Sequence, residues 1–100
     1  MTSRFVEEAQ REFLDAISEY EKILPGLGRR FKEEIDRSLS WITDQPELYR
    51  PRPGSHRRIN LRVFPYYIAY VVRRQTLWVL AVAHASRKPL YWISRRGEVV

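Results

Sequence analysis

The chain has 100 residues, of which 44% are hydrophobic and 13% aromatic, so we expect one globular domain over residues 1–100 rather than a disordered basic tail. It has no cysteine, two histidines and no apolar run of about eighteen residues, so we expect a cytoplasmic protein without a disulfide, metal, cofactor or membrane segment. Residues 1–49 carry seven Lys or Arg against eleven Asp or Glu, whereas residues 50–100 carry eleven against one, which predicts an anionic ligand or partner for the second half.

The first half predicts two amphipathic helices. Apolar or small residues recur at close to helical spacing from Phe5 to Leu24, with Ser3 as the candidate N-cap. A second apolar stripe runs from Leu27 to Ile42. A Pro-Gly turn separates the two stripes, so we expect an antiparallel helix hairpin whose apolar faces are covered by another element.

The second half predicts a small sheet. After an irregular stretch over 47–56, residues 58–63 alternate between polar and apolar, and apolar runs follow at 67–72 and 77–84. One alternate set in the first strand is expected to face the helices: Ile59, Leu61 and Val63. The expected fold is α+β, with the N-terminal helix hairpin packed on a three- to four-stranded, mainly antiparallel sheet.

Several short segments occur in a particular order along the chain. They are Glu8-Ala9, Tyr20-Glu21, Pro25 to Phe31, Ile42 to Pro46, Arg57-Arg58, Phe64-Pro65-Tyr66, Leu80 to His84 and Arg87 to Trp92. In this order and spacing the chain resembles the ParE/RelE superfamily of bacterial type II toxins over nearly its whole length. Members of that superfamily usually begin with a full β-strand. Here only four residues precede Phe5, so the sheet is expected to lack this strand or to keep a stub of it.

The resemblance implies a growth-inhibiting toxin that is silenced by an antitoxin encoded beside it. ParE-like members poison DNA gyrase, whereas RelE-like members cut messenger RNA, usually on the ribosome. The antitoxin typically wraps a partly disordered segment over the toxin in a hetero-oligomer. The positive charge from Arg50 onward predicts that this segment is acidic and amphipathic.

Arg58 and Arg62 are candidate anion ligands. They are four residues apart on an alternating strand, so both are expected on one face, with Asn60 between them. Guanidinium groups suit phosphate or carboxylate because each presents a planar fork of donors. The alternative is a solvated face whose arginines discourage edge pairing.

A second candidate set follows the last strand. RNA cleavage through the 2′-hydroxyl needs a base, a cation at the phosphate and an acid for the leaving oxygen. His84 would be the base, Arg87 or Arg62 the cation, and Tyr91 a stacking platform or acid. Ala85 departs from the RelE-like pattern, in which a basic residue is expected just after the strand. The alternative is that His84 hydrogen-bonds to backbone and that Tyr91, together with Trp92, packs the C-terminal segment.

The loop before the first strand is a third candidate surface. Arg50, Arg52, His56 and Arg57 crowd a proline-punctuated stretch that suits an acidic antitoxin segment or nucleic acid, or is merely a solvated connection. The residues predicted to bind antitoxin or target are Arg50, Arg52, Arg57, Arg58, Arg62 and Trp92. The three tryptophans are otherwise expected in the core or at the antitoxin contact. One set on the first helix is expected to be ordinary charged surface: Glu12, Asp15, Glu19 and Lys22.

The leading functional hypothesis is a ParE-like toxin directed at gyrase, because Ala85 weakens the ribonuclease pattern. The first alternative is a RelE-like endoribonuclease that uses Arg58, Arg62, His84, Arg87 and Tyr91. The second is a non-catalytic domain, either a general nucleic-acid binder or a decayed toxin that retains only its antitoxin.

Overall fold

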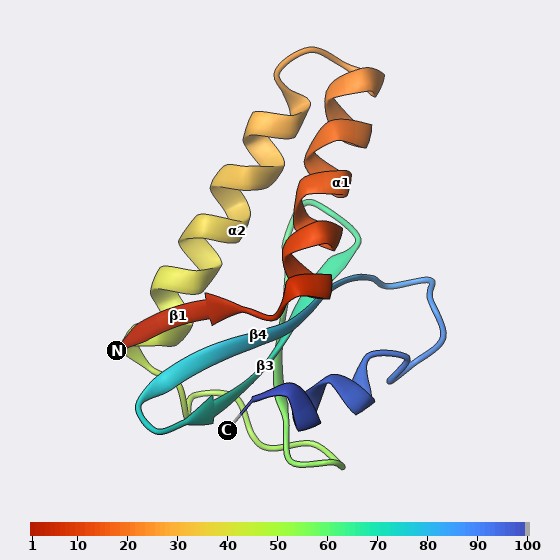
Figure 1. Ribbon diagram of the computed structural model, residues 1–100. Coiled ribbons are helices and arrows are strands. Elements are labelled where there is room, and N and C mark those ends of the chain that lie inside the picture. The colour runs from red at the N-terminus through yellow and green to blue at the C-terminus, as the bar shows by residue number, and fades with distance from the viewer. Residues whose placement is uncertain (100) are drawn as a thin grey trace.

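The computed structural model describes residues 1–99. In chain order they form β1 (Thr2–Phe5), α1 (Glu7–Ile23), α2 (Leu27–Asp44), β2 (Arg57–Asn60), β3 (Tyr66–Arg73), β4 (Thr76–His84) and a 3-10 helix, η1 (Ile93–Glu98). The strands make one sheet in the order β1-β4-β3-β2, in which β1 pairs with β4 in parallel and the other pairs are antiparallel. Figure 1 shows α1 and α2 side by side, rising from the sheet as a hairpin. The expected α+β fold is confirmed.

The N-terminal strand is present, but it is short. β1 pairs with β4 from Thr2 to Phe5, and the amide of Val6 donates to the carbonyl of Val79 at 3.0 Å. Ser3 therefore lies within the strand and does not cap α1. The N-cap residue is Val6, which makes no side-chain capping bond. The predicted Ser3 cap is wrong because strand pairing takes the residues that would otherwise lead into the helix.

Two glycines and a carboxylate shape the turn between α1 and α2. Gly26 has a φ of +91°, a conformation that favours glycine. At Gly28 a Cβ would lie 2.6 Å from the carbonyl oxygen of Ile17, so glycine permits the close approach of the helices. Glu21 accepts hydrogen bonds from the amides of Gly26 at 2.9 Å and Gly28 at 3.1 Å. The turn is thus fixed by backbone conformation, packing and side-chain hydrogen bonds together.

An aromatic cluster joins the hairpin to the sheet. Phe31 of α2 is fully buried, and its ring centroid lies 5.1 Å from that of Phe64 and 5.0 Å from that of Tyr66. Tyr20 of α1 contacts the same group, with its ring 4.9 Å from that of Phe64. Edge-on contacts of this kind stabilise packed aromatic rings beyond the area they bury. The cluster therefore sets how the hairpin sits on the sheet.

β2 is shorter than the alternating pattern predicts. It ends at Asn60. The amide of Leu61 still donates to the carbonyl of Tyr66 at 2.9 Å. The following two amides, those of Arg62 and Val63, donate to the buried carboxylate of Glu34 at 2.5 and 3.3 Å. Val63, expected to face the helices, is 69% exposed. Ile59 and Leu61 are buried as expected. The alternation therefore holds only as far as Leu61, after which Glu34 binds the backbone amides.

Trp92 lies in the core. Its side chain is fully buried, and its indole nitrogen donates to the hydroxyl of Tyr67 at 2.9 Å. The ring also meets that of His56 edge-on at 4.7 Å. Trp92 therefore packs the C-terminal segment onto the sheet, as the packing alternative expected.

Candidate functional site

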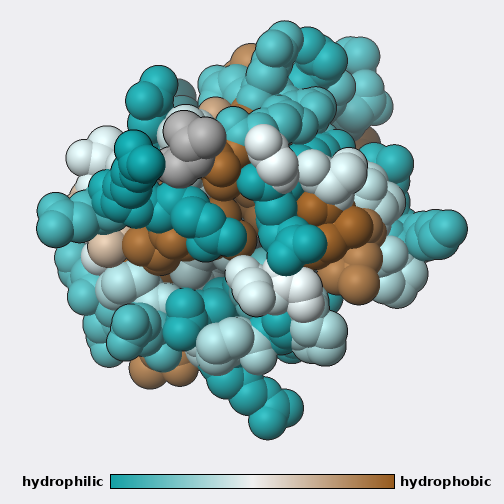
Figure 2. Space-filling model, turned by 60° about the horizontal axis from the view of Figure 1, so that its bottom comes forward, coloured by the Kyte–Doolittle hydropathy of each residue, from teal (hydrophilic) through white to brown (hydrophobic). Residues whose placement is uncertain are grey.

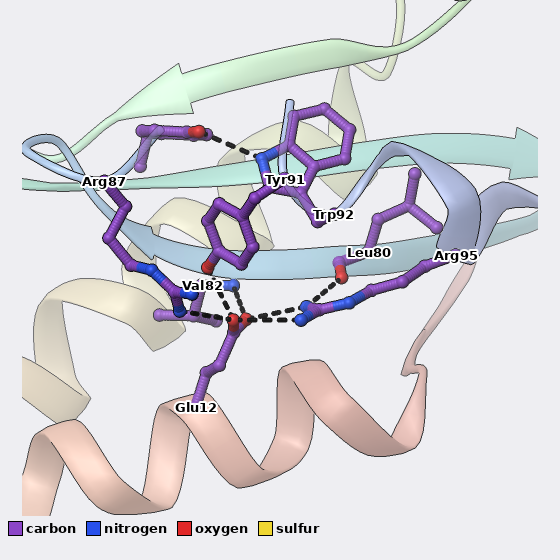
Figure 3. A network of polar contacts seen from close by, with 8 residues as sticks. Glu12, Leu80, Val82, Arg87, Tyr91, Trp92 and Arg95 are labelled. Atoms are coloured by element: carbon purple, nitrogen blue, oxygen red, sulfur yellow. Dashed lines mark hydrogen bonds and ion pairs between the residues drawn. The ribbon is translucent and has the colours of Figure 1, made fainter. Parts of the chain in front are cut away.

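The cluster at the end of β4 centres on Glu12, a carboxylate from α1 (Figure 3). The hydroxyl of Tyr91 donates to Glu12 Oε2 at 2.5 Å, and Arg95 donates to the two carboxylate oxygens at 3.0 and 3.2 Å. The amide of Val82 donates to Oε1 at 3.1 Å, and Arg87 lies 3.8 Å from Oε2. Two predicted site residues, Arg87 and Tyr91, are therefore brought together by a residue that was expected to be ordinary surface.

The ion pair between Glu12 and Arg95 covers part of the open edge of β4. Strand pairing between β1 and β4 ends at Val79. Just beyond it, Arg95 donates to the carbonyl of Leu80 at 3.0 Å, and the amide of Val82 donates to Glu12. Unpaired edge groups of a sheet need partners, and these two side chains supply them where the short first strand does not reach.

Beside Glu12 is a hollow of about 210 Å³ in which cationic and acidic groups meet. Its lining comprises Glu12, Asp15, Ala16, Glu19, Tyr66, Val82, His84, Arg87 and Tyr91. The structure thus gathers three of the five predicted catalytic residues, His84, Arg87 and Tyr91, around one space. Three carboxylates share that lining, and their charge opposes the approach of a phosphate.

The three gathered residues are engaged with protein groups. Burial, followed by the hydrogen bond to Glu12, raises the pKa of Tyr91, so its hydroxyl stays protonated. The guanidinium of Arg87 stacks 3.8 Å from the centroid of the Tyr91 ring. His84 Nδ1 accepts the amide of Ser86 at 3.0 Å, which is the strand-end arrangement of the alternative reading. In the described residues, this cluster ties the C-terminal segment to α1 and β4.

Arg58 and Arg62 are not on one strand face, so that prediction is wrong. Arg62 lies beyond the end of β2, in the connection held by Glu34. Arg58 and Asn60 do lie on one face of β2, as expected, and Arg58 donates to the side-chain oxygen of Asn60 at 2.9 Å. Arg62 instead lines a hollow of about 360 Å³ with Trp41, Tyr49, Ile59 and Asn60.

A further hollow, of about 190 Å³, combines arginines and aromatic rings and has no carboxylate in its lining. It is lined by Arg52, Pro53, His56, Arg58, Tyr67, Pro89, Leu90 and Trp92. The guanidinium of Arg58 lies 3.9 Å from the centroid of the Tyr67 ring. Burial, followed by the charge of Arg52, lowers the pKa of Arg58, and the same two causes lower that of His56. Cations held together in this way favour an anionic group between them.

The remaining cations of the loop, Arg50 and Arg57, lie outside this hollow. Arg57 donates from Nε to the carbonyl of Tyr49 at 2.6 Å and so anchors the loop. It is paired in register with Tyr70, one residue along from Arg58, and adjacent strand residues face opposite sides of a sheet. Arg50 is exposed. The predicted binding residues therefore form no single surface. Three of them, Arg52, Arg58 and the buried Trp92, line one hollow.

Most of the second-half charge is left without an acidic neighbour. From Arg50 onward, Arg87 and Arg95 are the cations that lie within 4.0 Å of a described side-chain carboxylate, and both pair with Glu12. Figure 2, which turns the lower end of Figure 1 forward, shows apolar patches divided by hydrophilic side chains. This end of the molecule therefore offers apolar contact area between polar groups.

The sequence carries one signal for the position of Glu12. Glu12 is three residues from Ala9 and four from Ala16, both buried on α1, and directly precedes the buried Phe13. It therefore borders the apolar stripe rather than the solvent side. Within residues 1–99 no cluster of three potential metal ligands is found, and none of the helices described is long and apolar enough to cross a membrane.

The sequence model of the ParE toxin family of the parDE type II toxin–antitoxin systems matches residues 4–89. The chain belongs to this ParE toxin family. Membership makes it a type II toxin and implies a cognate antitoxin as its partner. The match spans both helices and β2 to β4, and so includes Glu12, Arg52, Arg58 and His84.

The ParE-family chain has relatives at both the sequence and the structural level. It is 29% identical to the toxin ParE2 of Mycobacterium tuberculosis, in strains CDC 1551 / Oshkosh and ATCC 25618 / H37Rv, over 79 residues that cover 78% of this chain and 75% of the relative. A chromosomal ParDE system from P. aeruginosa has a similar chain, with a TM-score of 0.70 and 17% identity over 86% of this chain and 97% of that one. The isolated E. coli RelE toxin is also similar, with a TM-score of 0.63 and 21% identity over 98% of both chains.

Proposed function

We propose that this ParE-family toxin arrests growth by inhibiting DNA gyrase through binding, without catalysis of its own. The observation that supports this is that acidic residues bind or face the predicted ribonuclease residues in the cluster at the end of β4. Arg95 and the hydroxyl of Tyr91 are bound to Glu12, and Asp15 and Glu19 share the lining of the hollow. A nuclease needs a cationic, accessible phosphate site, whereas a binding inhibitor does not.

We propose further that the cognate antitoxin silences the toxin through an acidic, amphipathic segment. The hollow shared by Arg52 and Arg58 lacks a carboxylate, and Pro89 and Leu90 in the same lining provide apolar contact area. An anionic side chain of the antitoxin would there lower the repulsion between the two guanidinium groups.

The test combines purified components with cells. The purified chain is added to DNA gyrase in a supercoiling assay and, separately, to messenger RNA with and without ribosomes. We expect loss of supercoiling and intact RNA. Induced expression should arrest growth with a DNA-damage response and with cellular messages preserved.

The opposite pattern would overturn the gyrase proposal in a defined way. Message cleavage that is abolished by Arg62→Ala together with Tyr91→Phe, in a variant that remains folded, would establish the ribonuclease alternative. Harmless expression of folded protein at high level would instead indicate a decayed toxin or a general nucleic-acid binder.

A further inference from the structure

The turn of the helix hairpin presents large apolar side chains to solvent at the far end of the molecule. Ile23 is 72% exposed and Leu24 is 54% exposed. Figure 1 places this turn at the top of the hairpin, away from the sheet and from both chain ends. Two large aliphatic side chains at adjacent positions of one tip contribute nothing to the core, and exposed apolar contact area of this kind is typical of interaction sites.

The same tip places positive charge where a helix disfavours it. Arg29 and Arg30 lie in the first turn of α2, which contains no acidic residue. The N-terminal end of a helix carries partial positive charge, so cations there reduce stability. Among residues 1–99 neither arginine lies within 4.0 Å of a carboxylate oxygen. Two local preferences are thus violated at one place, and violations without structural gain are expected at functional surfaces.

The turn is also held rigidly in shape. Glu21 binds the amides of Gly26 and Gly28, the amide of Leu24 donates to the carbonyl of Tyr20 at 3.1 Å, and the amide of Leu27 donates to the carbonyl of Leu24 at 3.0 Å. Because these backbone groups are already satisfied, binding through the tip would cost little ordering entropy.

We infer that this tip, defined by Ile23, Leu24, Arg29 and Arg30, is the surface that engages the toxin's cellular target. A narrow convex tip fits a concave pocket on a folded protein. An extended or wrapping antitoxin segment instead requires a groove or a strand edge. The apolar pair and the two free cations specify the pocket as apolar with an acidic rim. This inference rests on the proposed function, in which the target is a protein, DNA gyrase.

Two double variants test the inference: one removes the apolar side chains of the tip, and the other reverses its charge. Ile23→Ser with Leu24→Ser removes the apolar contact from solvent-exposed positions. Arg29→Glu with Arg30→Glu reverses the charge in the first turn of α2, where acidic residues favour the helix, so the variant should be at least as stable as the wild type. A matched control is Arg37→Glu, an exposed charge reversal farther along the same helix.

The readout is the concentration of toxin that halves gyrase supercoiling, with thermal denaturation as the check on folding. We expect each double variant to need at least about tenfold more toxin, as for loss of a central interface contact, and Arg37→Glu to match the wild type. Equal inhibition by the wild type and both double variants would overturn the inference and leave the proposed function intact.

A wild-type chain that arrests growth without inhibiting gyrase would instead overturn the proposed function. The tip would then be judged by growth arrest in cells. Loss of arrest in both double variants, with Arg37→Glu still toxic, would support the tip as the contact to another target. Arrest that persists in the double variants would refute it, as would a wild-type chain that arrests nothing.

Discussion

At the scale of single residues, Glu12 binds groups that are 70 to 83 positions away in the sequence. Its side chain is 16% exposed, and that of Arg95 is 14% exposed. Glu12→Ala would leave the guanidinium of Arg95 without its neutralising carboxylate, and the amide of Val82 without its acceptor, in a mostly dry setting. We expect the free energy of unfolding to fall by about 2–4 kcal/mol, measured by urea denaturation. Glu19→Ala, which removes an exposed carboxylate from the same helix, should change it little; equal losses in the two variants would contradict the network.

The position of Glu12 could be predicted from the sequence only in part. Its place beside Ala9 and Phe13 indicates closeness to the core. Its partners cannot be found by local spacing, because Tyr91 and Arg95 reach it only once the C-terminal segment folds back over β4. The sequence correctly predicted His84, Arg87 and Tyr91 as neighbours, because they are close in the chain. It did not predict the acids that face them, because those acids lie on the distant helix α1.

His56 provides a second prediction at this scale, in the pH dependence of stability. Burial, followed by the charge of Arg52, lowers its pKa from the ordinary value near 6.5. The unfolded chain therefore binds the proton more readily than the folded chain as the pH falls below that value. The contribution of His56 to the free energy of unfolding is therefore fully present above about pH 6.5, and it declines as the pH drops toward the folded-state pKa. Thermal denaturation between about pH 7.5 and 5.5 should show this decline, and His56→Gln should reduce it; an unchanged slope in the variant would refute the assignment.

At the scale of elements, helices were easier to predict than strand ends. The apolar stripes of α1 and α2 repeat over four or more turns, so the hairpin and its Pro-Gly turn were correctly predicted. β1 has only four residues, too few for an alternating pattern, and it is defined by pairing with β4. The end of β2 was missed because it depends on Glu34, which is distant in sequence and binds the amides of Arg62 and Val63 just beyond the strand.

Glu34 is therefore expected to hold the connection between β2 and β3. Glu34→Ala would leave the amides of Arg62 and Val63 without this acceptor, and we expect a loss of about 1–3 kcal/mol in the free energy of unfolding. Hydrogen exchange of these two amides should accelerate more than that of the amides in β3. The neighbouring Glu33→Ala, an exposed position on α2, serves as control and should leave both measurements near their wild-type values. Unchanged exchange in Glu34→Ala would show that the connection is held by other contacts.

At the scale of the whole molecule, the two halves of the chain differ in charge and also in what their charges do. In the first half Arg11, Lys22 and Lys32 pair with carboxylates within the helices. In the second half the ion pairs within the described residues converge on Glu12, which leaves the cations of the β2 region open to an outside partner. The hairpin tip and the β2 region lie at different ends of the molecule (Figure 1), so target and antitoxin would first contact separate surfaces.

That division makes the salt dependence of antitoxin binding informative. Arg52 and Arg58 share a hollow without a carboxylate, so an acidic antitoxin segment should bind there with an affinity that falls as salt rises from about 0.05 to 0.5 M. Calorimetric titration of the cognate antitoxin should show this fall. Arg52→Gln with Arg58→Gln should weaken binding and flatten its salt dependence, whereas Arg73→Gln with Arg74→Gln, which removes the same charge at the β3–β4 turn, should affect both much less. Equal effects of the two pairs would mean that only net charge attracts the antitoxin, and salt-independent binding would mean that apolar contacts dominate.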